Sequence, residues 1–248
     1  SGPTDQDVVI AAIEAAAQGF TAPFRPVLPP LADRIGLTGL GSSTRADAMV
    51  LPFGVVDEPE RQRQPLAVLD LGGTDRVMVS GGSQTGRTTF ARTLITALAQ
   101  RFRPDQVHLY VIERVPSGLA AYAGLPHCGG VISAAEPDRV RRLVQWLSGE
   151  VERRRWVRLS DNGTGAVVGP AIVVVIDGWE VFENRADPAF VETSLLTTLR
   201  EVIAVGVTVG VHVVAIGGPS LATGKVAEQY QRRLVLPFSQ EEDRRACV

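Results

Sequence analysis

The sequence predicts an α/β fold whose mainly parallel sheet is covered by helices on both faces. Apolar, β-branched runs expected as strands occur at 76–80, 107–113, 171–176 and 211–216. Helical patterns separate these runs at 88–101, 137–156 and 189–204. Strands that alternate with helices of this length form parallel sheets, because each helix carries the chain back to the edge where the next strand starts. A glycine-rich loop directly after the first strand is the third observation.

The composition of the 248 residues is that of a globular protein, with 45% hydrophobic and 21% charged residues, which excludes a disordered chain. A net charge of −2 and a pI near 6.0 give no overall attraction to nucleic acid or anionic lipid. The apolar runs are too short or too polar to span a bilayer, and the polar start lacks a secretion signal. Cys128 and Cys247 have no partner at metal or disulfide-framework spacing, so a reducing cytoplasm is expected.

The first 33 residues are expected to form a helix and a proline-rich linker, ahead of one domain over 34–248. Thr4 and Asp7 have the spacing of a capping box, and apolar residues then recur at helical spacing. Prolines at 23, 26, 29 and 30 exclude regular structure in the segment that follows. Two further apolar runs are expected as strands near the start of the domain, at 49–56 and 66–71.

The loop after the strand at 76–80 has the spacing of a phosphate-binding loop, GxxxxGK[ST], and leads into the helix expected at 88–101. In such a loop the glycines let backbone N–H groups converge on phosphate oxygens at a helix N-terminus, where the helix dipole adds a favourable field. The predicted fold is therefore that of a P-loop NTPase, with ATP and Mg²⁺ as the expected cofactors. The residues expected to bind nucleotide are Gly81, Gly82, Ser83, Gln84, Thr85, Gly86, Arg87, Thr88 and Thr89. The alternative is a glycine-rich turn that binds nothing.

One position of this phosphate loop (residues 81–89) departs from the pattern. Arg87 stands where the pattern has a lysine, whose compact ammonium bridges the β- and γ-phosphates. The planar fork of arginine is larger and is aimed differently. Because Lys225 is the only lysine among 25 basic residues, the arginine alone is a weak signal.

A carboxylate follows the buried strand at 171–176. Asp177 is expected to hold Mg²⁺ through water, and Thr88 to place its hydroxyl on the same ion. Many ATPases of this fold place a second acid directly afterwards to polarise the attacking water, whereas Gly178 follows here and the next acid is Glu180. No general base is evident, so Asp177 is the one catalytic candidate and hydrolysis is expected to be weak or absent. The alternative is that Asp177 only forms a turn.

The strand at 211–216 ends at Gly217 and Gly218, where motor ATPases of this fold commonly carry a polar sensor for the γ-phosphate. Neither glycine has a side chain with which to sense a phosphate. His212, near the start of this strand, is interpreted as a structural residue.

Arginines gather in and just after the helix expected at 137–156. They are Arg139, Arg141, Arg142, Arg153, Arg154, Arg155 and Arg158. Asp138 lies four residues before Arg142, and Glu150 lies four before Arg154, which is the spacing of ion pairs on a helix surface. A solvated helix face or a subunit contact is therefore favoured over a nucleic-acid interface.

Three stretches together resemble the FtsK/SpoIIIE-type ATPase domains of EccC, the cytosolic motor of type VII (ESX) secretion. They are 82–89 (GSQTGRTT), 124–131 (GLPHCGGV) with 138–142 (DRVRR), and 174–179 (VVIDGW). Two segments are also similar to those that join successive ATPase domains in that family, 51–57 (LPFGVVD) and 28–31 (LPPL). The resemblance covers most of the chain.

EccC is a membrane-anchored chain with several such domains in series, and this sequence resembles the second. The resemblance implies a RecA/FtsK-like fold in the cytoplasm, joined to the membrane only through its parent chain. It implies neighbouring ATPase domains and a secreted ESX substrate as partners, and no nucleic acid. It also implies that the first domain is the main motor, while later domains bind nucleotide or substrate and restrain or assemble it. Gly178 is similar to these later domains, whereas Arg87 departs from them.

The leading hypothesis is a degenerate ATPase domain that binds ATP weakly or tightly, hydrolyses little of it, and serves in motor assembly, regulation or substrate export. A second hypothesis is a docking module that binds no nucleotide and takes a secretion signal or a neighbouring ATPase domain instead. An apolar surface groove, and an Arg87 side chain filling the phosphate position, would favour the second. A third hypothesis, DNA translocation, ranks last because the chain is nearly neutral.

Overall fold

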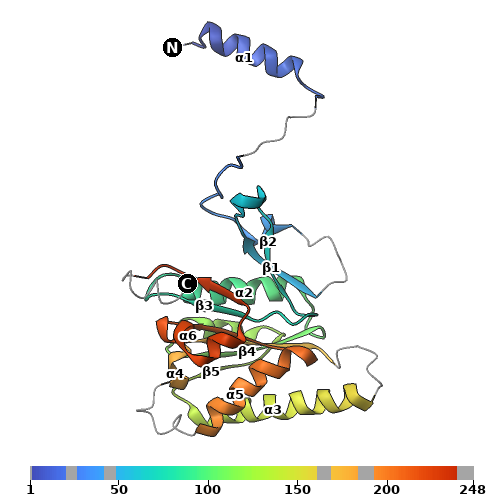
Figure 1. The fold of residues 1–248 in the computed structure, drawn as a ribbon, viewed down its shortest axis with the longest axis vertical. Helices are drawn as coiled ribbons and strands as arrows, with labels where there is room; N and C mark the ends of the chain where they lie inside the picture. Colours follow the sequence, from blue (N-terminus) through green and yellow to red (C-terminus); the bar gives the residue numbers. More distant parts are fainter. Residues whose placement is uncertain (1, 21–26, 42–48, 161–168, 184–192, 239–248) are drawn as a thin grey trace. The chain divides into compact units, whose positions relative to one another are not determined.

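The computed structural model describes residues 2–20, 27–41, 49–160, 169–183 and 193–238 (Figure 1). The chain divides into two units. One comprises Ser1–Asp33 and Val56–Pro65, and the other comprises Arg34–Val55 and Leu66–Val248. None of the described helices is both long enough and apolar enough to cross a membrane.

In the first unit, helix α1 (Asp5–Ala16) forms where the sequence predicts it. The predicted capping box is present, since the Asp7 N–H donates to Thr4 Oγ1 at 3.3 Å and the Thr4 N–H donates to Asp7 Oδ2 at 2.8 Å. No residue of α1 is buried. The unit also contains the 3₁₀-helix η2 (Pro59–Arg61) and a hydrogen bond of 2.8 Å from Gln64 Nε2 to the Pro29 carbonyl.

The second unit is built on a six-stranded sheet with the strand order β5-β4-β6-β7-β3-β8, in which every neighbouring pair is parallel. The strands are β3 (Val77–Ser80), β4 (Val107–Glu113), β5 (Cys128–Ser133), β6 (Ala171–Asp177), β7 (Val211–Gly217) and β8 (Arg232–Val235). This sheet confirms the predicted fold class.

Helices cover both faces of the sheet (Figure 1). On one face, α2 (Arg87–Arg101) packs its buried Leu94 and Leu98 into one hydrophobic core. On the other face, α3 (Pro137–Ser160) and α5 (Thr193–Gly206) contribute to a second core. The residues of β6 alternate between the two, with Val173 and Val175 in the first core and Val174 and Ile176 in the second. A strand buried on both faces explains the continuous apolar run at 171–176.

The two apolar runs near the start of the domain form a separate antiparallel pair, β1 (Val50–Val55) and β2 (Leu66–Asp70). Leu51 and Leu69 of this pair are buried in the same core as α2. Short elements complete the second unit. They are η1 (Leu37–Leu40), η3 (Leu119–Gly124), α4 (Glu180–Glu183), η4 (Val207–Val209), α6 (Pro219–Thr223) and η5 (Lys225–Gln229).

The predicted elements differ from the structure at three places within the described residues. The edge strands β5 and β8 are not predicted, because β5 begins Cys-Gly-Gly and β8 is short and begins with two arginines. Helix α3 continues to Ser160, into the start of the segment expected as a polar loop. The rest of that loop, 161–168, and the first residues of the helix predicted at 189–204 lie outside the described residues.

Candidate functional site

The phosphate loop, Asp177 and the two glycines at the end of β7 meet at one edge of the sheet. Ser80 at the end of β3 is in register with Gly217, and Asp177 at the end of β6 is in register with Ile216. The carboxyl ends of these three neighbouring strands therefore lie side by side. In open parallel sheets this edge is where ligands bind.

The first two glycines of the phosphate loop are held by the protein itself. The Gly81 N–H donates to the Gly217 carbonyl at 3.1 Å, and the Gly82 N–H donates to the Pro237 carbonyl at 3.0 Å. A Cβ atom at Gly81 would lie 2.7 Å from the Leu236 Cβ, so packing against the segment after β8 requires a glycine there. Both residues frame the loop rather than offering their N–H groups to a ligand.

The rest of the loop presents unengaged backbone donors. Within the described part of the chain, no acceptor binds the N–H groups of residues 83–88, at the N-terminus of α2. Gly86 has φ of 106° and Gln84 has φ of 61°, so the backbone turns through two left-handed residues before α2 begins. The Thr85 hydroxyl supports that turn by donating to the Gly82 carbonyl at 2.9 Å. Converging N–H groups at the start of a fifteen-residue helix are suited to phosphate oxygens.

Thr88 and Asp177 lie together, as their proposed shared role requires. The Thr88 hydroxyl donates to Asp177 Oδ2 at 2.8 Å. Burial raises the pKa of the Asp177 carboxyl above its usual value, although the Thr88 hydrogen bond and the charge of Arg87 oppose this rise. One hydroxyl and one carboxylate at the mouth of the loop are oxygen ligands of the kind that Mg²⁺ prefers. These residues therefore fit a nucleotide-bound Mg²⁺, whereas Thr89 is exposed on the next position of the helix.

Arg87 does not fill the loop, because its guanidinium is paired with a carboxylate. Arg87 Nη1 lies 2.8 Å from Glu180 Oε1, and both side chains are about three-quarters buried. The same oxygen accepts a hydrogen bond of 2.5 Å from the N–H of Gly218. Sequence reasoning identified Glu180 only as the next acid after Asp177. Its position three residues after Asp177, at the start of α4, was the available signal.

Packing excludes a side chain at Gly178 and is tight at Gly217, the two positions where the sequence lacks an acid and a polar sensor. Gly178 has φ of 109°, and a Cβ atom there would lie 2.3 Å from the Arg114 Cβ. A Cβ atom at Gly217 would lie 3.0 Å from the Trp179 Cβ and 3.1 Å from the Leu221 Cβ. An acid at position 178 would need a shift of the backbone, and a polar side chain at position 217 would need Trp179 and Leu221 to move by a few tenths of an ångström.

Glu113 is a second acid at this edge that sequence reasoning missed. It ends β4 in register with Asp177 and is buried. One of its carboxylate oxygens, Oε2, accepts from the N–H of Ser117 at 3.1 Å and from the Ser117 hydroxyl at 2.9 Å. The register of neighbouring strand ends, rather than any motif, brings Glu113 to the site.

His212 lies away from the site and joins β7 to the turn after β2. It is buried, with Nε2 3.0 Å from the Leu71 carbonyl. Burial lowers the pKa of the imidazole, and the nearby carbonyls oppose that change. The geometry supports the structural interpretation.

The arginines of α3 are mostly paired within the helix. Arg139, Arg141, Arg153 and Arg155 each form an ion pair with an acid three residues earlier. Arg154 does not lie on a solvated face, contrary to the prediction from the sequence. Its side chain is 3% exposed, pairs with Glu150 at 2.7 Å, and donates to the carbonyls of Val209 and Pro170. The cluster is therefore locally neutralised and partly structural, which does not support a nucleic-acid surface.

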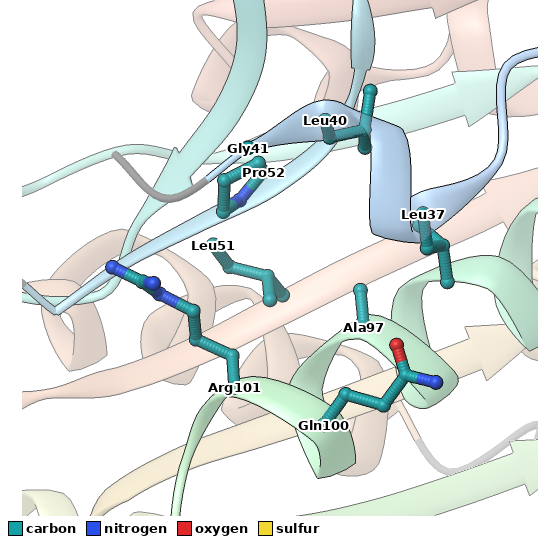
Figure 2. Close-up of a pocket in the computed structure, with 8 residues that line it drawn as sticks. All are labelled: Leu37, Leu40, Gly41, Leu51, Pro52, Ala97, Gln100 and Arg101. Atoms are coloured by element: carbon teal, nitrogen blue, oxygen red, sulfur yellow. The ribbon is translucent and has the colours of Figure 1, made fainter. Parts of the chain in front are cut away.

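An open pocket of mixed polar and apolar lining lies away from the phosphate loop, between η1, β1 and the end of α2 (Figure 2). Its volume is about 120 Å³. Three leucines, a proline and an alanine contribute apolar groups, and the Gln100 and Arg101 side chains of α2 contribute polar ones. The lining residues are Leu37, Leu40, Gly41, Leu51, Pro52, Ala97, Gln100 and Arg101.

Comparison with known proteins gives a consistent family match. Residues 41–222 match the FtsK/SpoIIIE family. The ESX-1 secretion system protein EccCb1 of Mycolicibacterium smegmatis is 32% identical over 222 residues, which cover 80% of this chain and 35% of that protein. The chain thus spans about a third of the length of that relative.

Two solved structures from Thermomonospora curvata are also similar. The cytoplasmic domain of the type VII secretion ATPase EccC has a TM-score of 0.71 and 28% identity, covering 98% of this chain and 31% of that one. EccC ATPases 2 and 3, in complex with a signal sequence peptide, have a TM-score of 0.63 and 31% identity, covering 79% of this chain and 37% of that one.

Proposed function

The chain belongs to the FtsK/SpoIIIE family, and on this basis we propose that it is a nucleotide-binding domain of a type VII secretion ATPase with little hydrolysis of its own. One observation carries the proposal. The unengaged N–H groups of residues 83–88 and the Thr88–Asp177 pair suit binding, while Gly178 has no room for an acid and Gly217 carries no sensor side chain.

In this proposal each part of the site has one task in binding. The backbone N–H groups of residues 83–88 hold phosphate oxygens, and the dipole of α2 adds to their field. Thr88 and Asp177 hold Mg²⁺, directly or through water. Mg²⁺ bound there neutralises part of the phosphate charge. Arg87 supplies the remaining positive charge once it is released from Glu180.

Hydrolysis is expected to be slow because several groups that stabilise the transition state are missing. Removing one preorganised donor of charge stabilisation typically costs about 10²–10³ in rate. This chain has no acid at Gly178 and no sensor side chain at Gly217, and Arg87 replaces the lysine. The domain then serves the motor by assembly, regulation or export, in the cytoplasm beside neighbouring ATPase domains, with the membrane reached through its parent chain. The internal pairing of the α3 arginines argues against DNA as a partner.

Calorimetric titration with ATP and Mg²⁺, followed by a phosphate-release assay, tests the proposal. We expect saturable binding that Asp177→Ala weakens when Mg²⁺ is present, and phosphate release close to the uncatalysed background. Salt-dependent DNA binding is expected to be absent. Brisk hydrolysis that Asp177→Ala or Glu113→Gln abolishes would contradict the proposal, and the second variant would identify Glu113 as a base.

A second candidate function is docking of a peptide segment, favoured by the pocket beside Leu51 and Ala97 (Figure 2). The similar Thermomonospora curvata EccC structure contains a signal sequence peptide. Docking does not exclude nucleotide binding, because no cavity-lining residue belongs to the phosphate loop. Arg87 is paired with Glu180 and leaves the loop donors unengaged, which favours the nucleotide proposal over a module that binds none. Fluorescence anisotropy with a labelled signal peptide checks docking, and Ala97→Leu, which narrows the cavity, should weaken it.

A further inference from the structure

We propose that the Glu180 carboxylate is a built-in competitor of a terminal phosphate, so that the site prefers a nucleoside diphosphate and admits a triphosphate only when Glu180 moves away. This inference rests on the proposed nucleotide site. It assigns a specificity-determining role to a residue outside the phosphate loop and concerns which nucleotide the domain holds.

Two donors that a terminal phosphate needs converge on one oxygen of Glu180. Arg87 occupies the loop position whose cation bridges the β- and γ-phosphates, and its Nη1 lies 2.8 Å from Oε1. Gly218 follows the tip of β7, where a sensor for that phosphate is expected, and its N–H donates to the same oxygen at 2.5 Å. A carboxylate thus holds both donors, one cationic and one neutral, as a phosphate oxygen would.

The hydrogen bond between the Gly218 N–H and Glu180 depends on the absence of a side chain at position 218. A Cβ atom at Gly218 would lie 2.8 Å from Glu180 Oε1, so a larger residue would displace the carboxylate from the N–H group. Gly217 before it is closely packed against Trp179 and Leu221. The two glycines therefore have a positive role, since they let Glu180 reach the sensor position.

Only one of the two carboxylate oxygens of Glu180 has hydrogen-bond partners. Its second oxygen, Oε2, is buried and has no hydrogen-bond partner among the described residues. Buried polar atoms normally have a hydrogen-bond partner, and a buried atom without one is a reason to look for a function. Release of Glu180 to solvent would satisfy that oxygen, which lowers the cost of exchanging the carboxylate for a phosphate.

A nucleoside diphosphate and a nucleoside triphosphate affect the Arg87–Glu180 pair differently. The α- and β-phosphates can use the unengaged N–H groups of residues 83–88 while Arg87 and Glu180 stay together. A third phosphate brings negative charge to the Arg87–Gly218 position, where it meets the carboxylate as a like charge. A triphosphate must therefore break two charge-assisted hydrogen bonds to Glu180, one of them also an ion pair with Arg87, before it gains its own.

Calorimetry with ADP and with a non-hydrolysable ATP analogue, both with Mg²⁺, tests this inference. We expect the wild-type protein to bind ADP about tenfold or more tightly than the analogue, a ratio that corresponds to about 1.4 kcal/mol. Glu180→Ala and the shape-conserving Glu180→Gln should raise affinity for the analogue by about tenfold and change ADP affinity by less than about twofold. Glu152→Gln, which breaks an exposed arginine pair on α3, should leave both affinities unchanged.

Circular dichroism and thermal unfolding establish that each variant is folded before its affinities are compared. Equal wild-type affinities for the two ligands, or a Glu180→Gln variant that binds the analogue no better, would overturn this inference and leave the proposed function standing. Loss of analogue binding in both Glu180 variants would also overturn it, because Glu180 would then only position Arg87. Binding of neither nucleotide by the wild type would overturn the proposed function as well.

Discussion

At the scale of single residues, Gly178 has two constraints on its identity. Its φ of 109° is unfavourable for any side chain, and its missing Cβ faces the Arg114 Cβ at 2.3 Å. We expect Gly178→Ala to lower the free energy of unfolding by about 1–3 kcal/mol. Gly149→Ala is the matched control, since Gly149 lies exposed in α3 with nothing within 4 Å of a new Cβ, and it should raise stability by about 0.5–1 kcal/mol.

Urea unfolding of both variants measures this difference. A Gly178→Ala protein as stable as the wild type would show that the backbone at this point relaxes without cost. In that case the acid missing after Asp177 could be restored by one substitution, contrary to the tight packing described here.

The contact between Thr88 and Asp177 was predictable from the phosphate-loop motif and the strand before Asp177. The loop spacing and the apolar run before Asp177 place both residues at strand ends, and the structure brings them within 2.8 Å. Glu180 could not be paired with Arg87 in the same way. That contact depends on the turn into α4 and on Gly218, and no local pattern specifies either distance.

At the scale of elements, α3 is anchored by one buried arginine. Arg154 pairs with Glu150, and Glu150 also accepts from Arg153. Hydrogen bonds from Arg153 and then Arg154 lower the pKa of Glu150 from 4.5 to about 2. A folded-state pKa below the unfolded value means that this stabilisation is complete above about pH 4.5 and is lost as pH falls toward about 2.

We therefore expect Glu150→Gln to lower stability at neutral pH by about 3 kcal/mol, because a buried guanidinium loses its counter-charge. The variant should also lose part of the decline in stability between about pH 5 and pH 2. Glu152→Gln, whose pair with Arg155 is exposed, should cost no more than about 1 kcal/mol. Unfolding measured across this pH range checks both, and parallel pH profiles for wild type and Glu150→Gln would contradict the assignment.

The central strands, which have long apolar runs, were predicted from the sequence, whereas the edge strands were not. Strands β4, β6 and β7 are long apolar runs, since both of their faces are buried. Strand β5 contains Gly129 because the Tyr110 ring of the neighbouring strand would lie 2.4 Å from a Cβ there. A glycine required by a neighbour's side chain weakens the local strand signal, so β5 was missed.

At the scale of the whole molecule, we expect the first 33 residues to add little to the stability of residues 34–248. No residue of α1 is buried, and in the first unit Gln64 donates one exposed hydrogen bond to Pro29. A variant lacking residues 1–33 should keep its free energy of unfolding within about 1 kcal/mol and its nucleotide affinity unchanged. Thermal unfolding and calorimetry of the shortened chain test this, and a large loss of stability would contradict the expected division at residue 34.

The arrangement of the sheet also bears on how the protein is made. Strand β3, which leads into the phosphate loop, is flanked by β7 (Val211–Gly217) and β8 (Arg232–Val235), more than a hundred residues later in the chain. Parallel pairing over such separations forms late in folding. The apolar β3 strand therefore leaves the ribosome long before its neighbours are synthesised. Nucleotide cannot assist folding until nearly all of the domain has been translated, although its binding loop is encoded in the first half.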